Sequence, residues 1–80
     1  MIKVLFFATL RDKAGTRQVE VDLPNGTTIS QLKMMLVEKY PDLGGSLGHC
    51  LVAVNHHYDT DESEIPADAE VAFFPPVSGG

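Results

Sequence analysis

The sequence has few of the residues that usually cross-link a small domain or attach it to nucleic acid. It contains one cysteine, Cys50, and six lysine and arginine residues against eleven aspartates and glutamates, for a formal net charge of −5. A single cysteine excludes a disulfide within the chain, so stability is expected to come from packing. With no export signal, it also favours a reducing, cytoplasmic setting. The acidic balance disfavours binding to phosphate backbones, and no nucleic-acid partner is expected.

The sequence also lacks a long hydrophobic run. Its most apolar stretch, residues 1–8, is far shorter than the roughly 20 residues that cross a bilayer, so no membrane partner is expected. Hydrophobic residues nevertheless make up 44% of the chain and charged residues 21%, a balance typical of a folded protein. Eighty residues are enough for one domain with a single core, and leave little material for a deep catalytic cleft.

Alternating and β-branched residues predict a sheet. In residues 2–9, Val4 and Phe6 share one face, and Leu5 and Phe7 share the other. Because both faces are apolar, such a strand is central and covered on both sides, or one side is reserved for a partner. The other predicted strands are residues 18–23, residues 50–54, residues 70–74 and a short returning strand that begins at Tyr58 after a turn at residues 55–57. The first two strands are expected to pair antiparallel.

One helix is predicted between the second and third strands. Thr28 and Gln31 have the spacing of a capping box at its start. Pro41 is expected to end it, because proline disfavours helical geometry in the residue before it. Lys33 flanks the apolar stripe of this helix, and Met34 falls nearly opposite the stripe and is expected to be exposed. The stripe itself consists of Ile29, Leu32, Leu36 and Tyr40.

The remaining segments are predicted to be loops: residues 10–17, residues 42–48 and the acidic residues 59–64. The acidic loop lacks the glycine and flanking helices of a calcium-binding EF-hand. The element order is strand, strand, helix, strand, minor strand, strand. It predicts an α+β fold, a β-grasp (ubiquitin-like) roll with a mixed sheet and one main helix, over residues 1–74.

Residues 75–80 are predicted to be a flexible tail. Pro75 and Pro76 end the last strand and favour an extended stalk, and six residues can reach roughly 20 Å. Gly79 and Gly80 have no Cβ, so they could thread a channel too narrow for other residues. The chemistry is expected at the carboxylate of Gly80. ATP in a partner enzyme could activate it as an acyl-adenylate, and a sulfur nucleophile could then displace AMP and leave a thiocarboxylate.

The two ends of the chain resemble the MoaD family, the small sulfur-carrying subunits of molybdopterin synthase. The resemblance rests on the opening MIKVLFFA, the closing EVAFFPPVSGG and the residues Ala53-Val54-Asn55 between them. It implies a β-grasp fold, a thiocarboxylate at Gly80 and no catalytic site in the chain itself. Sulfur from the carrier would convert cyclic pyranopterin monophosphate into molybdopterin.

The same resemblance implies three partners. They are a MoaE-type large subunit, in a heterotetramer of two small and two large subunits, a MoeB-type E1-like adenylyltransferase, and a sulfurtransferase. ATP and Mg²⁺ would belong to the adenylyltransferase, so this chain would bind no cofactor and no metal. Phe7, Tyr58 and Phe74 match the positions of a patch that docks the large subunit. Tyr58 departs from the aliphatic residue expected there. The tail would extend the interface through Pro75, Pro76, Val77 and Ser78, where threonine is common in place of serine, and Gly79 would help it thread into the active site.

Five other residues could suggest chemistry of their own. Cys50 opens an apolar strand, so packing is favoured over a role as nucleophile or persulfide carrier. His49, His56 and His57 have no metal-binding spacing and are expected in turns and at the surface. Arg11 matches a family position and is predicted to have a surface or local ion-pair role.

Three alternative functions remain open at this point. The first is a related sulfur carrier for thiamin or cysteine synthesis. The second is a ubiquitin-like modifier, whose terminal glycine would form an isopeptide bond with lysines. The third is a β-grasp interaction module that needs no terminal glycine. An iron–sulfur ferredoxin of this fold needs four cysteines and is excluded, because Cys50 is the only one.

Overall fold

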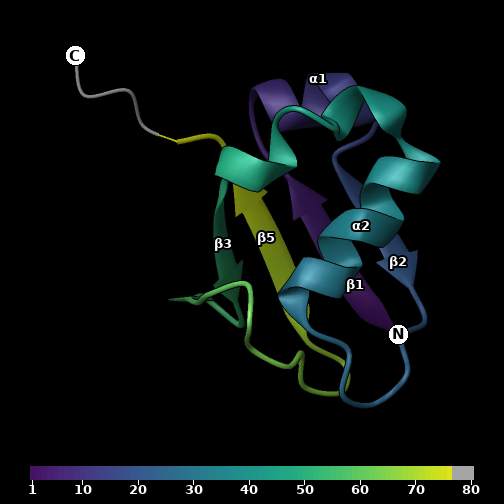
Figure 1. Cartoon of the computed structure of the whole chain (residues 1–80), viewed down its shortest axis with the longest axis vertical. Helices are drawn as coiled ribbons and strands as arrows, with labels where there is room; N and C mark the ends of the chain where they lie inside the picture. The colour runs from purple at the N-terminus through teal and green to yellow at the C-terminus, as the bar shows by residue number, and fades with distance from the viewer. Residues whose placement is uncertain (77–80) are drawn as a thin grey trace.

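The computed structural model describes residues 1–76, which form a five-stranded mixed sheet packed against helices (Figure 1). The order across the sheet is β2-β1-β5-β3-β4. The central strands β1 and β5 run parallel, whereas β1–β2, β5–β3 and β3–β4 pair antiparallel. This topology confirms the predicted β-grasp fold and the antiparallel pairing of the first two strands. The strands are β1 (Ile2–Phe6), β2 (Gln18–Val21), β3 (Leu51–Val54), β4 (His57–Tyr58) and β5 (Glu70–Phe74).

The long helix α2 (Ile29–Lys39) begins and ends as predicted. The backbone N–H of Thr28 donates to Gln31 Oε1 at 2.9 Å, and the N–H of Gln31 donates to Thr28 Oγ1 at 3.2 Å, which completes the capping box. The helix ends just before Pro41, and Met34 is exposed. In residues 1–76, no helix is long and apolar enough to cross a membrane.

Two of the predicted loops contain helical turns. Residues 10–17 were predicted to be a loop, and this is wrong for most of the segment, because α1 (Thr9–Ala14) occupies it. Leu10 and Ala14 of α1 are buried, and Gly15 ends the helix at φ 75° with its N–H donating to the carbonyl of Arg11. The predicted loop at residues 42–48 likewise includes parts of the 3₁₀ turns η1 (Pro41–Leu43) and η2 (Leu47–His49).

The start of α1 explains why β1 is shorter than predicted. The strand was expected to reach Thr9, but it ends at Phe6. Ala8 has φ 53° and ψ −127°, a conformation that residues with a Cβ rarely adopt, and it turns the chain out of the sheet into α1. No side chain caps this helix, so the sequence carries no N-cap signal for it.

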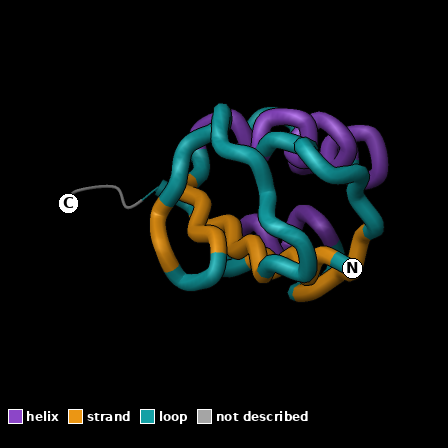
Figure 2. Tube along the Cα trace, turned by 90° about the horizontal axis from the view of Figure 1, so that it is seen from below, coloured by secondary structure: helices purple, strands orange, loops and turns teal. Residues whose placement is uncertain are grey.

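The core lies between the sheet and α2. Figure 2, turned by 90° from Figure 1, shows most of the helical turns on one side of the strands. Phe6 of β1 and Phe73 of β5 stack with their ring centroids 6.2 Å apart, and Tyr40 meets Phe6 edge-on at 6.1 Å. Fully burying one such apolar side chain stabilises the fold by roughly 1.5–3 kcal/mol. The largest fully buried side chains are Phe6, Phe73, Leu10, Ile29, Leu32, Leu36, Leu43, Leu47, Val4 and Val71.

Lys33 is buried, which differs from its predicted place beside the apolar stripe. Its Nζ lies 2.7 Å from Asp61 Oδ1. The backbone of the same acidic loop also caps α2, because the carbonyls of Ser63 and Asp61 accept from the N–H groups of Ile29 and Ser30 at 3.0 and 2.9 Å. The loop is therefore attached to the start of α2 by one ion pair and two backbone hydrogen bonds.

Candidate functional site

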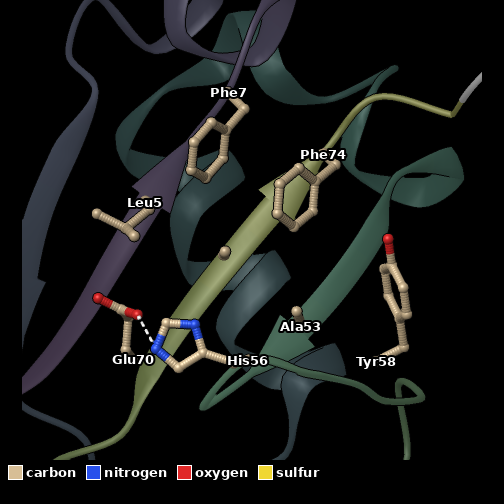
Figure 3. Close-up of a pocket in the computed structure, with 8 residues that line it drawn as sticks. Leu5, Phe7, Ala53, His56, Tyr58, Glu70 and Phe74 are labelled. Carbon is tan, nitrogen blue, oxygen red and sulfur yellow. Dashed lines mark ion pairs between the residues drawn. The ribbon is translucent and has the colours of Figure 1, made fainter.

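The face of the sheet opposite α2 carries an exposed apolar surface, the open-face patch, defined by Leu5, Phe7, Tyr58 and Phe74. Strand alternation produces it: Val4 and Phe6 point into the core, so Leu5 and Phe7 point the other way. The patch surrounds a shallow hollow of about 270 Å³ whose floor includes Ala53 and Ala72. Figure 3 shows Leu5, Phe7 and Phe74 on one side of Ala53 and Tyr58 on the other. Exposed apolar clusters of this kind mark surfaces that bind other proteins.

The aromatic pair Phe7–Phe74 is the centre of the open-face patch. The two rings stack with centroids 4.7 Å apart and an interplanar angle of 11°. Phe7 is 42% exposed and Phe74 is half-buried. Phe7 immediately follows β1, and Phe74 ends β5, so both lie at the same end of this parallel strand pair. A stacked aromatic pair presents a flat apolar surface.

Tyr58 lies on the other side of the hollow. It is 76% exposed and extends from β4, whose register places it opposite Ala53 of β3. The two-residue turn between these strands has positive φ at Asn55 (50°) and His56 (72°), the geometry of a type I′ hairpin. Asn55 anchors the turn to β5, because its N–H donates to the Glu70 carbonyl at 2.8 Å and its Oδ1 accepts from the Glu70 N–H at 2.9 Å.

One ion pair borders the hollow on the side away from the phenylalanines. His56 Nε2 lies 3.3 Å from Glu70 Oε2, as the dashed line in Figure 3 shows. The histidine side chain is 85% exposed, so this pair contributes little to stability even when the imidazole is protonated. It makes this border of the patch polar, with a carboxylate at its base.

The chain leaves the sheet next to the aromatic pair. Pro75 and Pro76 follow directly after Phe74; Pro75 is half-buried and Pro76 is exposed. They lie beside a small hollow between Thr9 and His49. The remaining predicted site residues, Val77, Ser78, Gly79 and Gly80, lie outside the described residues.

The structure brings together three of the residues singled out in the sequence, Phe7, Tyr58 and Phe74, around one hollow. It adds Leu5 and the pair His56–Glu70, which sequence reasoning did not assign to this site. Leu5 could have been found, because it shares a strand face with Phe7. His56 could not have been found from the sequence, since the position of its side chain depends on the positive φ angles of the turn that contains it.

Cys50 does not line the central hollow of the open-face patch, although it lines a separate hollow with Tyr58. Its side chain is half-buried against the core, and its thiol donates to the carbonyl of Leu47 at 3.1 Å. Burial raises the pKa of the Cys50 thiol, and the nearby charge of Lys33 opposes that shift only in part. A raised pKa reduces the thiolate fraction, so the thiol is a weak nucleophile near neutral pH.

The histidines lie in turns or at the surface, as predicted. His49 ends η2, His56 lies in the β3–β4 turn, and His57 begins β4; all three are exposed. Within residues 1–76 no group of three or more His, Cys, Asp and Glu side chains could hold a metal ion. Asp59 of the acidic loop has its pKa lowered by a hydrogen bond from the Ser63 hydroxyl and by one from the Thr60 N–H.

A β-grasp sheet with an apolar open face and a chain that leaves from its end defines a small ubiquitin-like protein. Residues 4–80 match the model of the ThiS family, so the chain belongs to that family. It is 39% identical over 82 aligned positions to the molybdopterin synthase sulfur carrier subunit of Escherichia coli (strain K12), and the alignment covers 100% of both chains.

Two solved structures show the same fold. The crystal structure of SAMP1 from Haloferax volcanii matches with a TM-score of 0.85 and 32% identity, over 99% of this chain and 98% of that one. A chain from the protein–protein complex of subunits 1 and 2 of the molybdopterin-converting factor of Helicobacter pylori matches with a TM-score of 0.69, over 99% and 97% of the two chains. At 21% identity, the second likeness shows the fold alone.

Proposed function

We propose that this chain is the sulfur-carrying small subunit of a molybdopterin synthase and has no catalytic site of its own. The full-length relative from E. coli, 39% identical, supports the assignment. The single observation that carries it is the exposed Phe7–Phe74 stack at the end of β5, from which the chain continues through Pro75 and Pro76 toward Gly80. A partner that binds the stack would receive the tail from the same side.

The chemistry takes place at the carboxylate of Gly80, in two stages. A carboxylate oxygen attacks the α-phosphorus of ATP and pyrophosphate leaves, which produces an acyl-adenylate. A sulfur nucleophile at the oxidation level of sulfide then attacks the acyl carbon. The bond from carbon to the AMP oxygen breaks, AMP departs with the electron pair, and a thiocarboxylate remains. A MoeB-type E1-like adenylyltransferase catalyses the first stage, and a sulfurtransferase supplies the sulfur.

Sulfur transfer takes place in the active site of a MoaE-type large subunit. The thiocarboxylate sulfur attacks a carbon of cyclic pyranopterin monophosphate and forms a bond to it, while the bond from that carbon to an oxygen breaks and the oxygen leaves with the electron pair. Water then attacks the acyl carbon of Gly80, the carbon–sulfur bond breaks, and the carboxylate is restored. Each molybdopterin molecule contains two sulfur atoms from this transfer and therefore needs two carrier chains with a thiocarboxylate at Gly80. The assembly is a heterotetramer of two small and two large subunits.

Docking on the large subunit uses the open-face patch. Phe7, Tyr58 and Phe74 supply apolar area, and the hollow between them can accept a side chain of the partner. The residues from Pro75 to Ser78 then form the stalk, and Gly79 passes the narrowest part of the channel because it has no Cβ. ATP and Mg²⁺ belong to the adenylyltransferase, this chain binds no cofactor, and the single cysteine favours a cytoplasmic location.

The test of this proposal is deletion of Gly80. The truncated protein should fold and melt as the full chain does, because terminal residues contribute little burial. It should not gain sulfur when incubated with the adenylyltransferase, ATP and a sulfur source, whereas the full chain should exchange one oxygen for sulfur in an intact-mass measurement. If the truncated protein still supports molybdopterin synthesis with its large subunit, the proposal is wrong.

A second candidate function is protein modification, and the likeness to SAMP1, named a small archaeal modifier protein, favours it. In that case the activated carboxylate of Gly80 would be attacked by a lysine amine, and an isopeptide bond would form. Mass spectrometry of tryptic peptides from a lysate separates the two functions. The last lysine or arginine of this chain is Lys39, so trypsin would leave residues 40–80 attached to a modified lysine. Lysines that carry this remnant would support the modifier, and a free thiocarboxylate with no such remnants would support the carrier.

A further inference from the structure

Next to the open-face patch lies a second hollow, of about 300 Å³, that is lined by two arginines. Arg11 comes from α1, and Arg17 from the segment before β2, so the fold brings them together from separate elements. Phe7 lines this hollow as well as the first one. The apolar patch therefore continues directly into a basic one, called the arginine rim below.

Within residues 1–76, Arg11 and Arg17 are two of the five lysine and arginine side chains that form no ion pair, and Lys33 is the exception. Arg11 was predicted to have a surface or local ion-pair role; it lies at the surface, and within residues 1–76 it forms no ion pair. Both residues are exposed. The other four basic residues have neighbours of their own: Lys3 stands opposite Glu20 and Glu70 in the sheet, Lys13 contacts Ser46, Lys33 pairs with Asp61, and Lys39 lies 5.7 Å from the ring centre of Tyr40.

The rim makes the charge distribution across the docking face uneven, with negative charge at one border and positive charge at another. The hollow at the centre of the patch has the carboxylate of Glu70 at one border, and the two guanidinium groups lie beyond Phe7. A net charge of −5 repels acidic surfaces in general, whereas the two guanidinium groups of this rim attract a carboxylate of the partner. Charges of opposite sign around an apolar centre set the orientation of a complex and raise its association rate.

We propose that Arg11 and Arg17 bind one or more carboxylates of the large subunit and so set the orientation in which the chain docks. This inference rests on the proposed function, because it takes the large subunit as the occupant of the patch. The planar guanidinium of arginine can hold a carboxylate through two parallel hydrogen bonds, which fixes direction as well as position. Correct orientation matters because the tail follows Phe74, and the ring of Phe74 stacks on that of Phe7.

The test measures affinity for the large subunit after charge reversal. The double variant R11E/R17E should bind roughly 10- to 100-fold more weakly than the wild type at low ionic strength, and each single variant should have an intermediate effect. The difference should shrink as salt is added, because exposed charges are screened. Lys39→Glu is the matched control for a single reversal, since it makes the same charge change on α2, and it should stay within about twofold of the wild type.

Folding and sulfur loading are followed in the same proteins. Circular dichroism should show an unchanged fold, because both side chains are exposed. If R11E/R17E does not fold, the neutral pair R11Q/R17Q decides the question, and it too should weaken binding. Sulfur loading of Gly80 by the adenylyltransferase should remain in every folded variant, measured by intact mass.

Three results would overturn the inference. The folded double variant could bind the large subunit as tightly as the wild type at low salt. It could lose sulfur loading while its affinity for the large subunit is unchanged, which would assign the rim to the adenylyltransferase. Sedimentation velocity could show that the rim holds a second copy of this chain. In contrast, failure of the wild type itself to acquire sulfur at Gly80 would refute the proposed function, so the two failures are distinguishable.

Discussion

Two stacked phenylalanine pairs occupy opposite faces of the same two strands, and their surroundings differ completely. Phe6 and Phe73 stack at 6.2 Å under α2 and are almost inaccessible to solvent. Phe7 and Phe74, one residue further along each strand, stack at 4.7 Å on the uncovered face. The same side chains in the same strand register thus build the core on one side and an exposed patch on the other. The two pairs differ because α2 covers one face of the sheet and leaves the other open, and not because their residue types differ.

The largest expected effect contrasts the two faces directly. Phe73→Ala leaves a cavity in the core and should lower the free energy of unfolding by about 3–5 kcal/mol. This is a large part of the total free energy of unfolding of an 80-residue domain, since roughly 0.05–0.15 kcal/mol per residue is typical. Phe74→Ala should cost about 1 kcal/mol or less, because its ring is already partly in water. Urea unfolding of both variants checks the prediction, and equal losses would contradict the division of roles.

The second expected effect reverses the comparison. Phe74→Asp should leave the fold intact and weaken the complex with the large subunit by about 2–4 kcal/mol, since it would place an unpaired charge in an apolar interface. Isothermal titration calorimetry with the large subunit measures the change. Met34→Asp is the control, because Met34 is exposed on α2, on the other side of the sheet. Unchanged affinity of the Phe74 variant would refute the docking surface.

A smaller effect is expected at the ion pair beneath the acidic loop. Asp61→Ala removes the counter-charge of Lys33, whose side chain is 11% exposed, while that of Asp61 is 50% exposed. The loss should be about 1 kcal/mol, because solvent screens the exposed half of the pair. Glu62→Ala makes the same charge change one residue away and should be nearly neutral. Thermal melting of the two variants separates them, and equal melting temperatures would show that the pair adds nothing.

The smallest effect concerns the single cysteine. Because burial raises the pKa of Cys50, less of it is thiolate at pH 7–8 than of a free thiol. Alkylation by iodoacetamide should therefore be slower in the folded protein than in urea. Cys50→Ala should still acquire sulfur at Gly80, as intact mass would show. Loss of sulfur loading in a folded Cys50→Ala protein would instead support a persulfide role for this residue.

Several features of the fold could be predicted because their signals are local. The capping box at Thr28 and Gln31 joins groups three residues apart, and the stop at Pro41 follows from the geometry of proline itself. Strand alternation placed Phe7 on the face opposite Phe6. Such signals depend on bonded neighbours, so they survive without knowledge of the rest of the molecule.

Other features depend on distant contacts and were missed. The helix α1 begins at Thr9, and the residue before it, Ala8, provides no side-chain cap. The buried residues of α1 are Leu10 and Ala14, so its stability comes from packing. Gly15 was the one available signal, since a glycine with positive φ often ends a helix. Lys33 is buried because the acidic loop, far along the sequence, supplies its counter-charge.

The sequence by itself determined the class of fold, the two faces of each central strand and the composition of the end that should carry the chemistry. These follow from side-chain periodicity and from backbone chemistry within a few residues. Only the tertiary structure decided which face stays open, how Tyr58 and His56 reach the hollow, and that Arg11 and Arg17 meet beside Phe7. Those outcomes depend on how strands and helices from distant parts of the chain pack, which no local pattern encodes.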